Sequence, residues 1–424
     1  MTLNIFVLGL DELNLASLRA IPSAERYTFH RLLTREELQF STATVPELVD
    51  RAANQLDTFD GSIDAIVGYW DFPVSTMLPI LCERYGLRSA DLEAVVKCEH
   101  KYWSRRVQQQ VIEEIPGFGT VELTDAEATL PVGLTYPAWV KPIKSASSEG
   151  AYYIENDDEL RAALKREYQQ IGRMRGRFHE ILAQVDLPPA IAAMGPATCL
   201  VEEAATGQQA TVEGFSFDGE VEVYGVVDSI TYSHVPSFLR YEYPSRLPQH
   251  VRDYMADVSR RVIAAIGLTN SAFNIEFFWD DDAQRLTLLE INARHSQSHA
   301  RLFHLVDGTP NHVCMLDIAL GRRPQLPRRE GDYAVAALWM LRCFTDGIPR
   351  RVPSSAEIAE VEARIPETTV EVVARQGRRL SESYRGDSYS YVLARIVVAG
   401  HTRAEVEESY HRCAEALPFE LEGT

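Results

Sequence analysis

Residues 272–294 read AFNIEFFWDDDAQRLTLLEINAR, two apolar runs on either side of an acidic turn. This pattern predicts a β-hairpin. Side chains alternate between the two faces of a strand, so Glu276 on the first strand and Glu290 and Asn292 on the second would share one face. Two carboxylates in apolar surroundings repel each other and lose solvation unless a cation neutralises them.

A magnesium ion would meet this need, because it accepts carboxylate and amide oxygens together with phosphate oxygens. We therefore predict that Glu276, Glu290 and Asn292 bind Mg²⁺, with Mn²⁺ as the alternative ion. Arg294 follows two residues later, where a cation could meet a transferring phosphoryl group or an anionic intermediate. The competing interpretations are a solvated sheet edge with incidental acids and an arginine that only forms a salt bridge.

The composition of the 424 residues is that of a soluble globular protein, with 46% hydrophobic and 24% charged residues and a formal net charge of −19. This acidic balance argues against sequence-independent nucleic-acid binding, which needs a basic surface. No apolar run reaches the roughly 18 residues of a membrane span. The six cysteines form no CxxC pair, and the first residues lack the basic start of a signal peptide. We therefore expect a cytoplasmic protein without structural disulfides or cysteine metal sites.

Strand-like and helix-like segments alternate over the first hundred residues, which indicates a parallel α/β sheet. Asp11 and Asp71 follow two of the expected strands, where open α/β sheets bind ligands, although a helix N-cap explains either residue equally well. Further strands, a long helical region at 157–184 and a mixed strand and helix tail follow. We place domains at 1–130, 131–327 and 328–424.

Three weaker signals lie upstream of the hairpin. Lys141 ends an expected strand just before the loop KSASSEG at 144–150, where an ammonium and backbone N–H groups could approach phosphates. Lys101 opens a basic helix that would otherwise be an ordinary surface helix. The segment VEEAATG at 201–207 carries Glu202 and Glu203, which suit an adenine amino group or simply form an exposed strand end.

Taken in order, these elements resemble the ATP-grasp superfamily, in particular its carboxylate–amine (L-amino-acid) ligase and biotin-carboxylase-like branch. The resemblance covers nearly the whole chain. It implies an α/β protein: an N-terminal parallel α/β domain, an α+β ATP-grasp domain whose two subdomains clamp ATP, and a C-terminal mixed domain. The ATP-binding residues that it implies are Lys101, Lys141, Ser147, Ser148, Glu202, Glu203, Ala205 and Gln209. Ser147 and Ser148 fall on the phosphate-covering loop, and Gln209 stands where a ribose-binding Glu is common.

The resemblance also implies an activity. A carboxylate substrate would attack the γ-phosphate of ATP to give an acylphosphate and ADP, and an amine such as an amino acid would then displace phosphate. Lys141, Arg294 and His295 would take part in catalysis, whereas Ser296, Gln297 and Ser298 would orient the acceptor. The alternative for the histidine is a purely structural role.

Two arginines outside these motifs are candidates for binding a substrate carboxylate. Arg240 lies in an aromatic-rich segment and could form a bidentate pair with a carboxylate, although that segment could equally be a loop that only closes over the core. Arg342 lies in an apolar strand of the tail, where an isolated arginine usually has an anionic partner.

The segment HSQSH at 295–299 replaces the glycines that often follow this arginine in the family's ligases, which leaves the substrate class open. Two other hypotheses therefore stand beside the ligase. One is an ATP-grasp enzyme that forms another bond, as a carboxylase or a thioester-forming ligase does, and the other is a catalytically silent nucleotide-binding subunit. The expected partners are small-molecule carboxylates and amines and, since relatives often form dimers, a second copy of the chain; nucleic acid and membranes are not expected.

Overall fold

The computed structural model describes residues 2–145, 150–169, 173–233, 235–382 and 389–422. Its N-terminal part is a parallel sheet in the order β2-β1-β3. These strands are β1 (Leu3–Leu8), β2 (Tyr27–Leu32) and β3 (Ala65–Gly68), and the helices around them are α1 (Glu12–Arg19), α2 (Arg35–Phe40), α3 (Val45–Asp57) and α4 (Val74–Arg84). The predicted parallel α/β sheet is confirmed.

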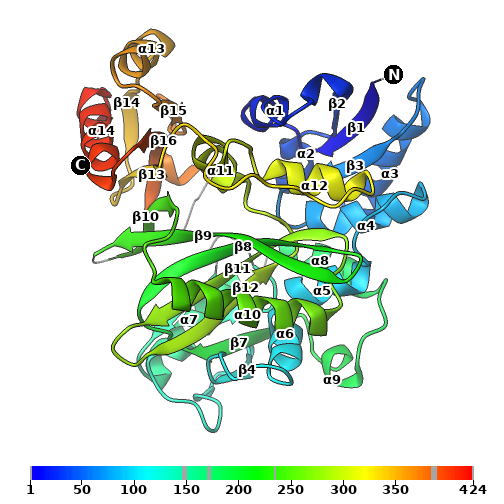
Figure 1. Cartoon of the computed structure of the whole chain (residues 1–424). Helices are drawn as coiled ribbons and strands as arrows, with labels where there is room; N and C mark the ends of the chain where they lie inside the picture. Colours follow the sequence, from blue (N-terminus) through cyan, green and yellow to red (C-terminus); the bar gives the residue numbers. More distant parts are fainter. Residues whose placement is uncertain (1, 146–149, 170–172, 234, 383–388, 423–424) are drawn as a thin grey trace.

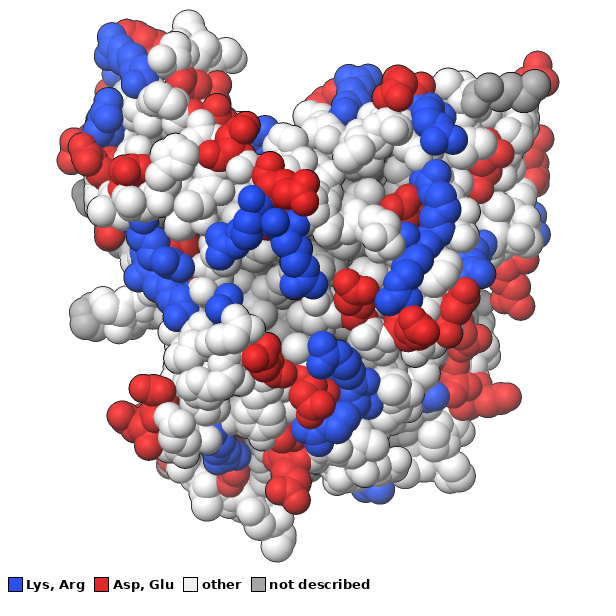
Figure 2. Space-filling view, viewed as in Figure 1, with Lys and Arg blue, Asp and Glu red and all other residues white. Residues whose placement is uncertain are grey.

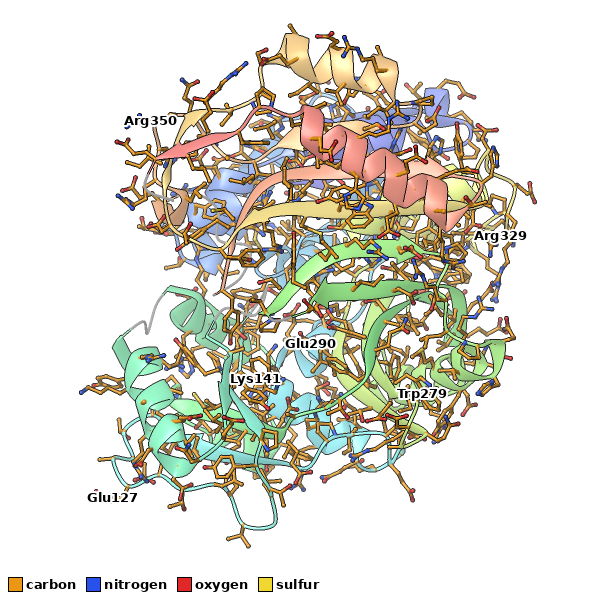
Figure 3. The ribbon with its side chains drawn as sticks, turned by 90° about the vertical axis from the view of Figure 1, so that its left-hand side faces the viewer. Glu127, Lys141, Trp279, Glu290, Arg329 and Arg350 are labelled. Atoms are coloured by element: carbon orange, nitrogen blue, oxygen red, sulfur yellow. The ribbon has the colours of Figure 1, made fainter. Side chains whose placement is uncertain are left out.

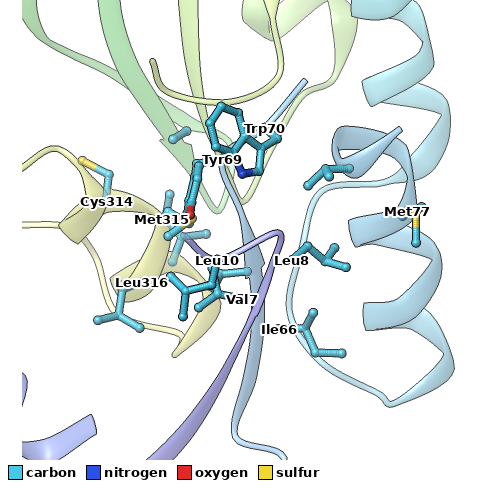
Figure 4. Close-up of a cluster of buried hydrophobic side chains, with 14 of the residues drawn as sticks. Val7, Leu8, Leu10, Ile66, Tyr69, Trp70, Met77, Cys314, Met315 and Leu316 are labelled. Atoms are coloured by element: carbon cyan, nitrogen blue, oxygen red, sulfur yellow. The ribbon is translucent and has the colours of Figure 1, made fainter. Parts of the chain in front are cut away.

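Apolar side chains from two distant parts of the chain cover this sheet (Figure 4). Met77 of α4 packs on one side, and Met315 and Leu316 of α12 (His312–Ala319) pack on the other. Leu316 is only 1% exposed, and burying a side chain of this size contributes about 1.5–3 kcal/mol. A helix that follows the 272–294 hairpin in sequence is therefore anchored on the N-terminal sheet.

A second, antiparallel sheet has the strand order β4-β7-β5-β6. Its strands are β4 (Phe118–Glu122), β5 (Ala138–Pro142), β6 (Tyr152–Ile154) and β7 (Thr198–Glu203), and between β6 and β7 the chain forms the helices α7 (Asp157–Gln169), α8 (Arg173–Leu182) and α9 (Pro189–Ala192). Arg177 of α8 donates to the backbone carbonyls of Leu38 and Ala43, both at 2.8 Å. These bonds join the helical region to the N-terminal part.

The third sheet is the largest, with the order β12-β11-β8-β9-β10-β13-β16-β15. Its strands are β8 (Gln208–Phe217), β9 (Glu220–Tyr232), β10 (Val235–Tyr243), β11 (Ser271–Asp280), β12 (Arg285–Asn292), β13 (Val335–Cys343), β15 (Thr369–Val372) and β16 (Tyr391–Gly400). Asp218 and Gly219 join β8 to β9 with positive φ angles of 49° and 86°, as a tight primed hairpin turn requires. The helix α10 (Gln249–Ile266) packs on this sheet (Figure 1).

The C-terminal residues extend the same sheet, because β13 pairs with β10 on one side and β16 on the other. The boundary that we propose at 327 therefore separates strands of one continuous sheet. The remaining elements here are β14 (Ile348–Arg351), α13 (Ser355–Arg364), α14 (Arg403–Ala416) and β17 (Glu420–Glu422). Thr402 and Glu405 form a capping box at the start of α14.

Three further helices join the sheets: α5 (Leu92–Glu99), α6 (Lys101–Gln108) and α11 (Ala300–Asp307). In Figure 1, α11 and α12 lie between the N-terminal part and the large sheet. On the face shown in Figure 2, Lys and Arg side chains lie among Asp and Glu side chains. In the described part of the chain, no helix has the length and apolarity to cross a membrane.

Candidate active site

Glu276 and Glu290 are direct cross-strand partners in the β11–β12 hairpin, and Asn274 and Asn292 form another cross-strand pair two residues along. The predicted hairpin and the shared face are confirmed. Burial, and then the neighbouring Glu290 charge, raise the pKa of Glu276 to about 7. Burial also disfavours the Glu290 carboxylate, but Lys101 together with Lys141 and Lys144 outweighs this effect and holds the Glu290 pKa below the usual value.

A short hydrogen-bond chain orients the Asn292 amide. The Asn274 Nδ2 donates to the Arg294 carbonyl at 2.9 Å, and because a carbonyl only accepts, the Asn274 Oδ1 must face the other way. That oxygen accepts from the Asn292 Nδ2 at 3.0 Å. The Asn292 Oδ1 is thereby left for another partner beside the two carboxylates.

These donors fit a magnesium ion, since they are two carboxylates and one amide oxygen with no sulfur or imidazole. Among the residues that the structure describes, no cluster of three or more His, Cys, Asp or Glu could hold a metal by itself. Magnesium sites in proteins commonly use one or two carboxylates and take further oxygens from substrate phosphates and water. Burial and the Glu290 charge together raise the Glu276 pKa despite the neighbouring Arg294 and Lys101.

Lys101 and Lys141 reach the site from different elements. Lys101 is the first residue of α6, and its ammonium contacts Glu290 and donates to the Ser145 carbonyl at 3.3 Å. Lys141 lies on β5, near the labelled Glu290 in Figure 3, and its charge also lowers the Glu290 pKa. The Lys141 ammonium contacts Glu202.

Sequence analysis missed Lys144 as a site residue. Its buried ammonium contacts Glu99 and lies 3.3 Å from the Asp71 Oδ1. Asp71 in turn accepts from the Arg294 Nη2 at 2.9 Å. Burial disfavours the charged Asp71, but Lys144 and then Arg294 hold its pKa far below the usual value. The available signal was that Lys144 opens the KSASSEG loop, three residues after Lys141.

The VEEAATG segment does not present the Glu202 carboxylate to a base. Glu202 is buried between Arg105 and Lys141, which overcome the cost of burial and lower its pKa to about 2. Glu203 accepts from the Thr135 backbone N–H at 2.9 Å. The expectation that the Glu202 side chain suits an adenine amino group is therefore wrong, because both of its oxygens are bound within the protein; for Glu203, which has one oxygen bound by Thr135, it stays a prediction.

The backbone of this segment is only partly bonded within the described residues. The Ala204 N–H donates to the Pro137 carbonyl at 2.9 Å, whereas the Ala205 N–H makes no such bond within the described residues. Gln209 lies on β8, and its Nε2 donates to the Glu276 Oε2 at 2.8 Å. Ser147 and Ser148 lie outside the described residues.

The segment at residues 294–299, called here the post-hairpin segment, is held by neighbours on several sides. The Ser296 N–H donates to the Glu213 Oε1 at 3.1 Å, and the His299 Nδ1 lies 2.8 Å from the same oxygen. The Ser296 carbonyl accepts from the Asn311 Nδ2 at 3.0 Å. Of Ser296 these bonds use only the backbone, so the side chains of Ser296, Gln297 and Ser298 keep their predicted acceptor role; the Gln297 Nε2 donates to the Ser298 hydroxyl at 3.1 Å.

His295 is buried and is not open to an acceptor substrate. Its ring is 1% exposed, and its Nε2 lies 2.7 Å from the Nδ1 of His312 at the start of α12. Burial lowers the pKa of His295 well below its ordinary value, with a smaller contribution from His312. We therefore replace the predicted catalytic role of His295 with a positioning role.

Arg240 lies away from this cluster. Its Nε donates to Glu242 at 3.1 Å, and its guanidinium lies over the Trp339 ring, 4.3 Å from the centroid. Strand alternation explains the error, because Arg240 and Tyr241 point to opposite faces of β10. Tyr241, which sequence analysis missed, is the residue on the site's face, where its ring meets His299 at 4.9 Å.

Arg342 lies near Tyr241 and lowers its pKa, although burial and then the Glu276 charge raise that pKa by more. The Arg342 Nε donates to the Phe238 carbonyl at 2.8 Å, and one Nη donates to the Ser390 hydroxyl, also at 2.8 Å. Arg342 therefore remains near the site, with part of its guanidinium bound to the protein.

Comparison with known proteins gives this arrangement a family. Residues 134–300, which include β5, β7 and the hairpin, match the ATP-grasp domain model. The chain carries an ATP-grasp domain. It is 29% identical over 136 residues to the D-alanine–D-alanine ligase of Thermotoga petrophila. That match covers 32% of this chain and 43% of the ligase, so it spans less than half of the relative's length.

Solved structures extend the similarity to the regions on either side of the ATP-grasp domain. The L-amino acid ligase of Bacillus licheniformis superposes with a TM-score of 0.73 at 15% identity, over 100% of this chain and 99% of that one. The Campylobacter jejuni biotin carboxylase, solved with β,γ-ATP, gives 0.65 at 16% identity, over 98% and 92%. At these identities the comparison establishes a shared fold.

Proposed function

We propose that this ATP-grasp protein is an ADP-forming ligase that activates a carboxylate as an acylphosphate and joins it to an amine, such as an amino acid. One observation carries the proposal. The carboxylate pair Glu276 and Glu290 lies in one cluster with four cations from three parts of the chain: Lys101 at the start of α6, Lys141 and Lys144 in and just after β5, and Arg294 just after β12. Such a cluster suits a phosphoryl group in transfer, whose negative charge must be neutralised from several sides.

In this proposal, Glu276, Glu290 and the Asn292 Oδ1 hold Mg²⁺, which would neutralise charge on the phosphates. The ammonium groups of Lys101, Lys141 and Lys144 bind phosphate oxygens and so exchange their present carboxylate partners for the nucleotide. The Ala205 N–H and neighbouring backbone groups bind the adenine ring, and Gln209 contributes beside Glu276.

Arg294 acts after the phosphoryl transfer, when the amine attacks. A carboxylate substrate attacks the γ-phosphate, the bond to the β-phosphate oxygen breaks, and ADP leaves. The amine nitrogen then attacks the acyl carbon, and the Arg294 guanidinium stabilises the oxyanion that forms. When the oxyanion collapses, the amide bond is retained, inorganic phosphate leaves and the amine proton passes to solvent. Gln297 and Ser298 face the acceptor. The names of the relatives, a D-alanine–D-alanine ligase and an L-amino acid ligase, support an amide-forming reaction of this class.

The test is phosphate release with ATP, Mg²⁺ and pools of amino acids, followed by mass spectrometry of the product. We expect ADP, phosphate and a condensed product, and an Arg294→Ala variant should release phosphate about 10²–10³-fold more slowly. AMP and pyrophosphate in place of ADP would overturn the acylphosphate route. Turnover that requires bicarbonate and no amine would indicate a carboxylase, and nucleotide binding without any turnover would indicate a silent subunit.

A further inference from the structure

A chain of buried side chains joins the N-terminal sheet to the post-hairpin segment. The His295 Nε2 lies 2.7 Å from the His312 Nδ1, and the His312 Nε2 lies 3.0 Å from the Asn14 Oδ1. The Asn14 Nδ2 in turn lies 3.0 Å from both carboxylate oxygens of Asp11. The two rings and the Asn14 side chain are each no more than 2% exposed.

The chain has only one consistent direction of donation. A carboxylate accepts, so the Asn14 Nδ2 faces Asp11, and the Asn14 Oδ1 must accept from the His312 Nε2–H. A neutral imidazole carries one N–H, which leaves the His312 Nδ1 to accept from the His295 Nε2–H. Burial lowers the pKa of His312 to about 3, in agreement with a neutral ring.

The same reasoning fixes the far end of the chain. With its proton on Nε2, His295 has an unprotonated Nδ1, and this atom has no hydrogen-bond partner among the described residues. The Arg294 Nε–H also has no partner there. The two groups are complementary, one an acceptor and one a donor. Both residues line a cavity of about 40 Å³ beside β3, a volume sufficient for a water molecule.

We propose that His312 and Asn14 are positioning residues for Arg294, because they hold the His295 ring in the single tautomer whose Nδ1 can accept from the arginine side. Arg294 is then held twice by the N-terminal part. Asp71 at the end of β3 binds its Nη2 directly, and Asp11, just past the end of β1, acts through the neutral chain. The effect of His312 and Asn14 on catalysis rests on the proposed function, whereas the tautomer of His295 does not depend on it.

The first experiment measures the tautomer in the full-length protein without substrates. Imidazole ¹⁵N spectra at neutral pH, with His295 assigned by the loss of its signals in His295→Gln, should show a protonated Nε2 and an unprotonated Nδ1. In His312→Leu the His295 signals should change to a mixture or to the Nδ1–H form. A wild-type ring protonated on Nδ1, or the same His295 tautomer in His312→Leu, would overturn the proposal whether or not the protein is a ligase.

The second experiment separates positioning from general damage. A glutamine at 312 can accept from His295 through its oxygen and donate to Asn14 through its nitrogen, so His312→Gln should recover most of the activity. His312→Leu should lower kcat about 10–100-fold, the size seen for residues that orient a functional group, while the KM for ATP changes little. A His304→Leu variant, on the neighbouring helix α11, is the matched control for loss of a partly buried histidine. Equal losses in His312→Gln and His312→Leu would contradict the proposal, and thermal unfolding would show whether each variant is folded.

Discussion

The end of the hairpin and the post-hairpin segment are neighbours in sequence, yet they hold their polar side chains in different ways. Around Glu290 the partners are charged and come from separate elements, as with Lys101 at the start of α6. In the post-hairpin segment His295 sits in a neutral hydrogen-bond chain that ends on α1. Arg294 connects the two regions. Its side chain donates to Asp71, and its carbonyl, at the start of the post-hairpin segment, accepts from Asn274 of the hairpin.

The two regions are therefore suited to different roles. Ion pairs between side chains on different elements can exchange partners when a polyanion enters, because an ammonium binds a phosphate as readily as a carboxylate. A buried neutral chain with each donor matched to one acceptor has no such alternative, since breaking it leaves polar atoms without partners. The charged region is therefore suited to bind and release, and the neutral region to stay in place.

The largest expected effect comes from the charged region. A Glu290→Gln variant removes one charge of the carboxylate pair while keeping its shape, so it weakens the proposed metal site and frees Lys101. We expect phosphate release to fall about 10³-fold or more, as several kcal/mol of charge stabilisation are lost. The measurement is steady-state phosphate release at saturating Mg²⁺ and ATP. An exposed acid on α14, in Glu408→Gln, is the control, and near-normal turnover in Glu290→Gln would refute the assignment of the metal site.

A smaller effect on turnover is expected from a change at Asp71, which binds Arg294 between the two regions. Asp71→Asn removes the carboxylate that Lys144 and Arg294 share, while the amide can still accept one hydrogen bond. We expect kcat to fall about 10–100-fold, with a smaller change in the KM for ATP, because Asp71 orients the arginine and binds no nucleotide itself. Asp60→Asn, an exposed change in the same part of the chain, should have no effect. If Asp71→Asn left kcat unaltered, direct positioning of Arg294 by Asp71 would be wrong.

The sequence was informative where a local pattern decides the geometry. Alternation along two strands placed Glu276, Glu290 and Asn292 on one face, and the acidic turn located the hairpin itself. It was uninformative where a contact joins distant elements. The ion pair of Lys141 with Glu202 and the bond of His312 to Asn14, 298 residues away, depend on how whole sheets pack.

The two errors over side-chain direction have a similar origin. Arg240 and Tyr241 are adjacent, and only the register of β10 against β13 decides which of them faces the site. Glu202 was assigned to an adenine contact or an exposed strand end because its partner Arg105 lies on a separate helix, 97 residues earlier. A charged residue in an apolar strand signals that a partner exists, but it does not identify the partner.

The smallest expected effect tests whether a neutral ring also supports the charged region. His100 is the N-cap of α6, where its Nδ1 accepts from the Trp103 N–H at 3.1 Å. Burial lowers the pKa of His100 to about 4. The unfolded chain therefore binds the proton first as the pH falls. The stabilising contribution of His100 is complete above about pH 6.5 and is lost as the pH approaches the folded value.

A His100→Asn variant isolates this contribution, because asparagine is a good N-cap that does not titrate. Between pH 7 and pH 5 the free energy of unfolding of the wild type should fall by about 2 kcal/mol more than that of the variant. Urea unfolding followed by tryptophan fluorescence at the two pH values gives this difference. Parallel pH dependence in both proteins would mean that His100 keeps its ordinary pKa, and that the helix carrying Lys101 does not depend on a neutral imidazole for its cap.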